Sequence, residues 1–248
     1  MVVASAGYRG GMSIHLAGGG WSEAMFTVFL REAQARAAGA GRVIPRIGVL
    51  LVADEDQSAA EYSAKYAAVL ASAGSCDPVF TVLQDGAEAT SALLSGIDGL
   101  LIGGGLTPAY LEAVLPIVDE IRLLVADGLP YLGFSAGAAI AADTAIIGGW
   151  KIGDVPVGAE EIGEDLEHVT VEEGLGLVDL AIDVHAAQWG TLARLIAATE
   201  AGLVDGGVAI DEDTALVVGD DDPYVVGVGS VWRVTPGDTG VVVSTVGA

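Results

Sequence analysis

Basic residues are scarce in this sequence, and their scarcity argues against several classes of partner. Lys and Arg together number 10 against 34 Asp and Glu, which gives a formal net charge of −24. A surface of that sign repels the phosphate backbone of nucleic acids and the headgroups of anionic membranes, and no cluster of Lys or Arg interrupts it. We therefore expect no nucleic acid and no membrane among the partners.

Cysteine and long apolar runs are also scarce. The single cysteine, Cys76, excludes an intramolecular disulfide and any metal site built from several cysteines, so we expect a reducing compartment and interpret Cys76 as a small apolar residue. Residues 1–11 lack the continuous apolar core of a signal peptide. Elsewhere, Gly, Pro or acidic residues break the apolar stretches before they reach the ~20 residues that span a bilayer. These absences predict a cytoplasmic protein.

The sequence does contain an alternation of two patterns. Short runs rich in Val, Ile and Leu alternate with longer Ala-rich segments of helical period, an order typical of parallel strands joined by crossover helices. We expect one α/β domain over residues 1–248, with a mainly parallel central sheet flanked by helices and a C-terminal set of short strands. The expected strands are 13–17, 47–53, 79–83, 99–102, 131–134, 208–210, 215–218, 225–228, 231–234 and 241–243. One helix is expected after Ser22, and others over about 58–73, 89–94, 136–142 and 191–198. A further helix is expected to begin at Thr107, which acts as its cap, and to kink at Pro116. We expect loops and a hairpin over residues 148–174.

One short motif has the form of a nucleophile turn. Ser135 lies between Gly133 and Gly137, after an apolar strand and before an Ala-rich helical segment. A serine hydroxyl must project from a sharp strand-to-helix turn to reach a carbonyl carbon, and glycines two residues before and after it relieve the crowding of that turn. The N–H of Ala136 then faces a developing oxyanion. This context predicts a serine hydrolase.

A base for Ser135 must come from one of three histidines. His15 lies in the expected first strand and precedes three glycines, and we interpret it as a satisfied strand residue. His168 lies in an acidic stretch and is expected at the surface. His185 ends an apolar run, at the edge where parallel sheets place their chemistry, and is the candidate base.

A carboxylate should orient the imidazole, and the sequence offers several. Asp183, Asp211, Glu212 and Asp213 each end or follow an apolar run. Their spacing alone does not choose between them.

Several longer motifs together resemble a known family. They are Gly103-Gly104-Gly105, Gly133-Phe134-Ser135-Ala136-Gly137-Ala138, Asp183-Val184-His185 with Arg194-Leu195, and Ile210-Asp211-Glu212-Asp213-Thr214-Ala215-Leu216. In this order they resemble the cyanophycinase and aspartyl dipeptidase family of serine peptidases. The resemblance implies a fold like that of class I glutamine amidotransferases, with serine in place of the usual cysteine nucleophile.

The resemblance also implies a role for individual residues. It makes Ser135 the nucleophile, His185 the general base and acid, and Glu212 the residue that orients His185. The implied oxyanion donors are the N–H groups of Ala136 and Gly104, and the implied substrate-binding residues are Gly105, Leu106, Asp183 and Arg194. No metal and no organic cofactor is implied. The order Ser, His, Glu differs from the Ser, Asp, His order of α/β-hydrolases.

Departures from the family pattern concern the substrate. Leu106 stands where the family usually carries Asn or Gln, and Val184, Ala186, Trp189 and Thr191 replace residues of the family's Asp-Gln-His-Phe and arginine segment. Lost polar groups remove charge-assisted hydrogen bonds, so we expect a small peptide other than cyanophycin, a polymer of aspartate carrying arginine.

Two other functions stay open at this point. A non-catalytic binding protein on the same scaffold is one, and an esterase with an α/β-hydrolase fold is the other. The sequence also leaves a homodimer open as the assembly.

Overall fold

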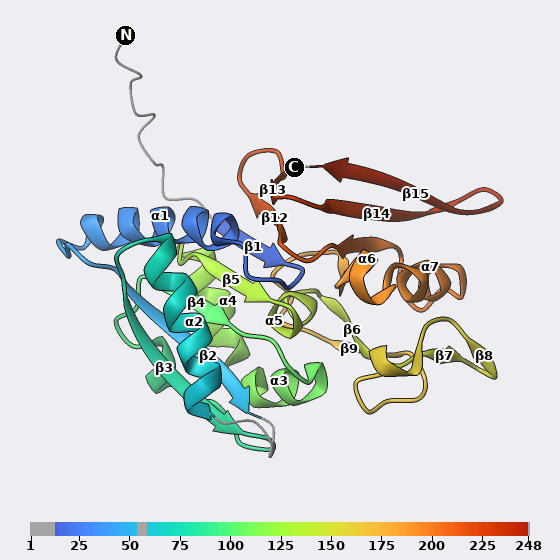
Figure 1. Cartoon of the computed structure of the whole chain (residues 1–248), viewed down its shortest axis with the longest axis horizontal. Coiled ribbons are helices and arrows are strands. Elements are labelled where there is room, and N and C mark those ends of the chain that lie inside the picture. The colour runs from blue at the N-terminus through green and yellow to red at the C-terminus, as the bar shows by residue number, and fades with distance from the viewer. Residues whose placement is uncertain (1–12, 54–58, 248) are drawn as a thin grey trace, which may run out of the picture.

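The computed structural model describes residues 13–53 and 59–247, and a mostly parallel sheet runs through its centre (Figure 1). Its strands among these residues, in spatial order, are β13 (Tyr224–Gly227), β12 (Thr214–Gly219), β1 (Ser13–Ala17), β5 (Tyr131–Phe134), β4 (Gly99–Ile102), β2 (Arg46–Ala53) and β3 (Asp77–Gln84). Strands β1, β5, β4, β2 and β3 pair in parallel, whereas β12 and β13 extend one edge in antiparallel pairing. The expected fold class is confirmed.

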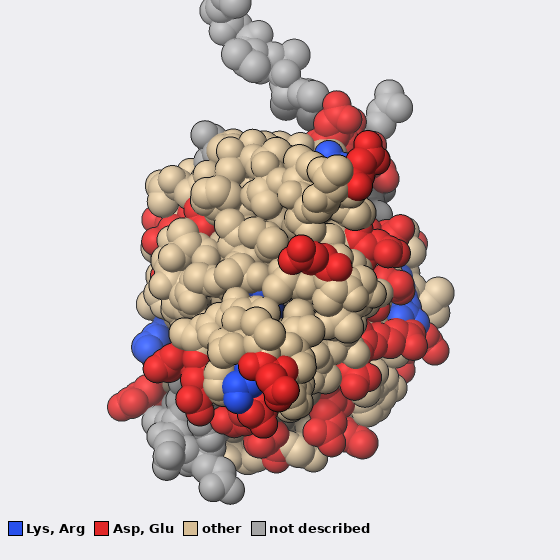
Figure 2. Space-filling model, turned by 90° about the vertical axis from the view of Figure 1, so that its right-hand side faces the viewer, with Lys and Arg blue, Asp and Glu red and all other residues tan. Residues whose placement is uncertain are grey.

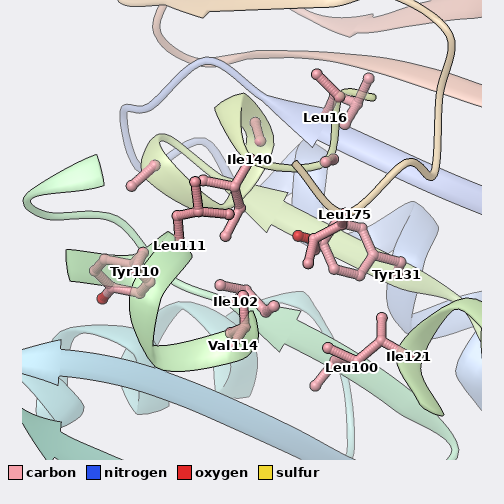
Figure 3. Packing of buried hydrophobic residues seen from close by; sticks show 14 of the residues in the cluster. Leu16, Leu100, Ile102, Tyr110, Leu111, Val114, Ile121, Tyr131, Ile140 and Leu175 are labelled. Atoms are coloured by element: carbon pink, nitrogen blue, oxygen red, sulfur yellow. The ribbon is translucent and has the colours of Figure 1, made fainter. Parts of the chain in front are cut away.

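Both faces of this sheet are buried, as the continuous apolar runs of a parallel sheet require. On β2, Ile47, Val49 and Leu51 face helices α1 (Glu23–Gly39) and α2 (Ala59–Ala73), whereas Leu50 and Val52 join the cluster on the other face. The elements on that other face are η1 (Ser91–Leu94), α3 (Thr107–Val114), η2 (Leu115–Ile117), α4 (Val118–Ala126) and α5 (Ala136–Ala139). Figure 3 shows residues of this second cluster, among them Leu100, Ile102 and Tyr131 of the sheet and Leu111, Val114 and Ile121 of the helices.

The C-terminal strands divide between two sheets, a partition that the sequence did not specify. Strands β12 and β13 join the central sheet, whereas the others build a second sheet in the order β10 (Ala181–Val184), β11 (Gly207–Ile210), β14 (Ser230–Gly237) and β15 (Gly240–Gly247). Helix α6 (Ala186–Trp189) follows β10, and α7 (Leu192–Glu200) packs on this sheet through Leu195 and Ala198. The segment expected as loops and a hairpin contains β6 (Thr144–Gly148), β7 (Lys151–Ile152), β8 (Val155–Pro156), η3 (Glu160–Ile162) and β9 (Thr170–Glu173).

Two helix ends differ from the sequence expectation. Thr107 is the first residue of α3 rather than its cap, and Leu106 precedes it without a side-chain capping bond. Glu164, distant in sequence, instead accepts hydrogen bonds from the Thr107 N–H and hydroxyl. Helix α5 ends at Ala139 rather than 142, because the N–H of Leu175 binds the carbonyl of Ile140 at 2.7 Å and takes the chain out of helical bonding. Pro116 lies in η2, between α3 and α4, as expected of a kink.

Surface properties bear on possible partners. None of the helices in the described part of the chain is long and apolar enough to cross a membrane. Figure 2 shows the side that carries α7 and the β7–β8 hairpin, where Asp and Glu gather at the edges and uncharged side chains fill the centre. Residues 1–11, for which we expected no signal peptide, and residue 58, the expected start of α2, lie outside the described residues.

Candidate active site

Ser135 lies on a sharp turn between β5 and α5. Its backbone has φ 53° and ψ −111°, a region that non-glycine residues rarely adopt and that is typical of nucleophile turns. The two flanking glycines make the turn possible: a Cβ on Gly133 would lie 2.4 Å from the Gly137 carbonyl oxygen, and one on Gly137 would lie 2.2 Å from that of Ile102. The turn therefore presents the Ser135 hydroxyl at the C-terminal edge of the sheet.

A chain of hydrogen bonds links Ser135 to a histidine and a glutamate. The Oγ of Ser135 lies 2.8 Å from Nε2 of His185, and Nδ1 of His185 lies 2.8 Å from Oε1 of Glu212. A carboxylate only accepts hydrogen bonds, so Nδ1 carries the ring proton and Nε2 presents its lone pair to the serine hydroxyl. This is the geometry in which an imidazole can take the serine proton.

The surroundings of His185 keep the imidazole neutral. Its residue is 7% exposed, and this burial lowers the pKa of the imidazole, partly offset by the hydrogen bond and charge of Glu212. Desolvation disfavours the charged form of a base, whereas a nearby carboxylate favours it. The net direction leaves a neutral ring, which can act as a base near neutral pH.

Neighbouring segments fix the position of the imidazole. The loop after β1 approaches it so closely that a Cβ on Gly19 would lie 2.2 Å from Cε1 of His185. The carbonyl of Gly18 accepts the His185 N–H at 3.0 Å, and the indole of Trp189 stacks on the ring with centroids 3.9 Å apart. Gly18 and Gly19 were not among the predicted site residues, because the local sequence does not show which distant side chain a glycine turn will contact.

Two backbone N–H groups beside Ser135 have no protein acceptor among the described residues. One belongs to Ala136, as expected, and the other to Gly105, which follows Gly104, the residue that packs against the Ser135 side chain. The N–H of Gly104, which we expected as the second donor, instead donates to the hydroxyl of Tyr66 at 2.9 Å. Tyr66 was not among the sequence candidates, and its hydroxyl removes Gly104 from the available donors.

The acidic run after β11 resolves into three separate roles. Only Glu212 reaches the imidazole. Asp211 is 6% exposed and accepts hydrogen bonds from the N–H of Ser230 and the indole of Trp232, which joins β11 to β14. Asp213, at φ 56°, accepts the N–H groups of residues 21 and 22, just before α1. The geometry of this turn thus selects Glu212 as the carboxylate that contacts His185, a choice that the sequence spacing left open.

Asp183 and Arg194 pair with each other in the protein interior. Nε and Nη2 of Arg194 donate to the Asp183 carboxylate at 2.8 and 2.7 Å, and Nη1 donates to the carbonyls of Ile162 and Gly149. The residues are 1% and 3% exposed. This position does not fit the predicted substrate-binding role of either residue.

The sequence model of peptidase family S51 matches residues 45–226, more than half of the chain. The chain belongs to peptidase family S51. A cyanophycinase of Synechococcus elongatus is 36% identical over 157 residues, which cover 61% of this chain and 46% of the relative. A cyanophycinase of Trichormus variabilis is 33% identical over 150 residues, which cover 58% of this chain and 47% of the relative.

The S51 member therefore spans about half the length of the curated relatives it matches. Among solved structures, a putative peptidase E protein from Listeria monocytogenes EGD-e aligns with a TM-score of 0.56 at 16% identity. The alignment covers 88% of this chain and all of the Listeria chain, and it supports the common fold.

The residues at which this S51 member departs from the family pattern lie in different environments. Val184, Ala186 and Thr191 are buried, and the Thr191 hydroxyl donates to the Val184 carbonyl at 2.6 Å. Trp189 is 51% exposed, and Leu106 is half-buried beside the exposed Gly105. Only Trp189 and Leu106 thus present changed side chains at the site surface.

The other candidates of this S51 member lie apart from Ser135. His15 is buried on β1, where Nε2 lies 2.8 Å from the Ser13 hydroxyl and 2.7 Å from Glu32, but its Nδ1 has no partner, so it is satisfied at one nitrogen only. His168 is exposed, as expected. Burial raises the pKa of the half-buried Cys76 thiol. No group of three His, Cys, Asp or Glu residues in the described ranges could hold a metal ion.

Proposed function

We propose that this S51 member is a serine-type peptidase or amide hydrolase that acts on small peptides, and that residues 1–248 form one hydrolytic domain. The hydrogen-bonded order Ser135, His185, Glu212 carries the proposal, because it joins a nucleophile, a base and an orienting carboxylate in one line. Free N–H groups on Ala136, which follows the serine, and on Gly105, in the neighbouring glycine turn, support it, since acyl transfer needs donors for the developing oxyanion.

The proposed reaction proceeds through an acyl-enzyme. The Ser135 Oγ attacks the scissile carbonyl carbon while Nε2 of His185 takes the hydroxyl proton, and Glu212 stabilises the imidazolium that results. The carbon–nitrogen bond then breaks, and the leaving amine takes the proton from His185. A water molecule attacks the ester, again through His185, and releases the acid and Ser135.

The proposed substrate carries an uncharged residue on its acyl side, unlike an aspartyl peptide. The cation retained from the family motif, Arg194, is buried and bound to Asp183, so it is not available to an acidic side chain. Leu106 and Trp189 offer apolar surface instead. The net charge of −24 acts in the same direction, because it disfavours anionic peptides.

A fluorophosphonate probe and a peptide library test the proposal. The probe should label Ser135 in the wild type, and Ser135→Ala should abolish both labelling and cleavage. Absence of labelling in folded wild-type protein would overturn the peptidase and favour a non-catalytic binding protein. Within the library, neutral acyl residues should be cleaved faster than aspartyl dipeptides and β-aspartyl-arginine; faster cleavage of the acidic peptides would overturn the altered specificity alone.

A further inference from the structure

Trp189 forms a close ring stack with His185. The two residues stand one helical turn apart, and the N–H of Trp189 binds the carbonyl of His185 at 2.8 Å. Their ring centroids lie 3.9 Å apart with 10° between the planes. The indole is half-exposed whereas the histidine is buried, so the indole covers one face of the imidazole from the solvent side.

The two hydrogen bonds of His185 leave one motion of its ring unrestrained. They hold Nε2 against Ser135 and Nδ1 against Glu212, but both allow the ring to tilt about the line that joins those nitrogens. Gly19 limits this tilt at the Cε1 edge, and a parallel indole limits it across a whole face. Trp189 is thus placed to fix the plane of the ring.

A stacked indole also distinguishes between the two charge states of the imidazole. The face of an aromatic ring attracts a cation, most strongly when water is excluded, and tryptophan is the strongest of the aromatic side chains in this respect. The charged groups around His185 are Glu212, Asp183 and Arg194, and the last two neutralise each other in a direct pair. The indole therefore adds to Glu212 in favouring the imidazolium.

We propose that Trp189 is a positioning residue that holds the His185 ring in the plane of its hydrogen bonds and stabilises the imidazolium formed as Ser135 attacks. This inference rests on the proposed function. It assigns a role at the site to a residue that stands outside the Ser135, His185 and Glu212 chain.

The variants Trp189→Phe and Trp189→Leu distinguish the effect of an aromatic face on the imidazole from the effect of excluding water from it. Both keep an apolar side chain over His185, but only phenylalanine keeps a π-face. The pKa of the His185 imidazole is measured by NMR in substrate-free protein, where His185→Gln assigns the signal among three histidines. The rate of fluorophosphonate labelling at Ser135 is measured across pH. Trp21→Leu serves as control, because Trp21 is exposed to a similar degree and contacts Phe134 and Tyr66.

We expect Trp189→Leu to lower the His185 pKa and to slow labelling about 2- to 30-fold on the plateau above that pKa. The difference should shrink on the acid limb, because the lower pKa leaves more of the base neutral there. Trp189→Phe should recover most of both, and Trp21→Leu should leave the His185 titration unchanged. If Trp189→Leu raises the pKa, the indole acts only by excluding water and the proposal is overturned. Equal values in the wild type and both Trp189 variants overturn it too. Absence of labelling in the wild type counts against the proposed function, and the NMR titration then still decides whether Trp189 favours the imidazolium.

Discussion

Two clusters of serine, histidine and glutamate lie at opposite ends of strand β1. Ser13, His15 and Glu32 meet where the strand begins. Ser135 and His185, with Glu212, meet beyond its end, where Ala17 accepts the Ser135 N–H at 2.9 Å and Gly18 accepts that of His185. The residue types are identical, so the difference between the two clusters lies in the arrangement of their atoms and in the backbone around them.

The first cluster places its serine and its glutamate on the same ring nitrogen. Nε2 of His15 faces Glu32 and therefore carries the proton, which leaves the lone pair on the unpartnered Nδ1. The Ser13 hydroxyl donates to Glu32 instead of to a base. Burial opposes the ionisation of Glu32, but its bonds to His15 and Ser13 outweigh this and lower its pKa. This cluster is a structural anchor between β1 and α1.

The second cluster places the serine and the glutamate on different nitrogens. The proton on Nδ1 leaves Nε2 free to accept from Ser135, and the turn adds N–H donors that Ser13, in an extended strand, does not have. A serine, a histidine and a glutamate in contact are therefore not sufficient for catalysis. What distinguishes the second cluster is that the serine and the glutamate bind opposite nitrogens of the imidazole.

The largest expected difference between the clusters comes from removing each serine. Ser135→Ala should lower the rate of peptide cleavage by at least roughly 10³-fold, because no other group supplies the nucleophile. Ser13→Ala should leave that rate unchanged. Rates are measured on the best library peptide, with circular dichroism to check folding. A large activity loss in Ser13→Ala would mean that the first cluster takes part in catalysis.

Replacing each glutamate should separate activity from stability. Glu212→Gln should reduce cleavage roughly 10²- to 10⁴-fold, since the amide does not compensate the charge of the imidazolium. Glu32→Gln should keep the rate but lower the free energy of unfolding by about 1.5–3 kcal/mol, the size of a hydrogen bond to a charged group. Kinetics and urea unfolding of both variants check this; equal activity losses would refute the distinction.

The sequence predicted the fold well where the pattern is local. The parallel strands were predicted from continuous apolar runs, which are buried on both faces of the sheet. Ser135 was predicted from the two glycines that its turn requires within two residues on either side. The partition of the C-terminal strands into two sheets depends on pairing between distant segments. No periodicity in those short runs determines their partners.

Candidate residues of the site were found by motif, but their contacts were not. Asp183 and Arg194 belong to the recognised pattern, yet they bind each other in the interior. Gly104 stands in the expected turn, yet the hydroxyl of Tyr66, from α2, occupies its N–H. In both cases the polar group is bound by a partner that the local sequence pattern does not reveal.

Glycines offer a third way to distinguish the imidazole site from an ordinary turn. Gly19 and Gly41 both have positive φ, at 106° and 76°, but a Cβ on Gly41 would meet nothing within 4 Å. Gly19→Ala should displace the His185 ring and slow cleavage roughly 100-fold, whereas Gly41→Ala should cost only about 1 kcal/mol of stability. Equal rates in the two variants, measured with folded protein, would show that the ring tolerates displacement.

The smallest expected effect is the pH dependence of Ser135 labelling. Burial lowers the pKa of His185, so the acid limb of the labelling rate should lie below the ordinary histidine value of about 6.5. The rate falls as the pH drops through the folded pKa, because the base becomes protonated. The free energy of unfolding changes in the same direction. Between the folded pKa and about 6.5 the unfolded chain binds more protons than the folded chain, so the contribution of His185 to stability is lost as the pH falls through this range. His15→Gln should leave the pH of the acid limb unchanged. If this variant shifts the acid limb, the limb does not report the protonation of His185 alone, and the prediction is wrong.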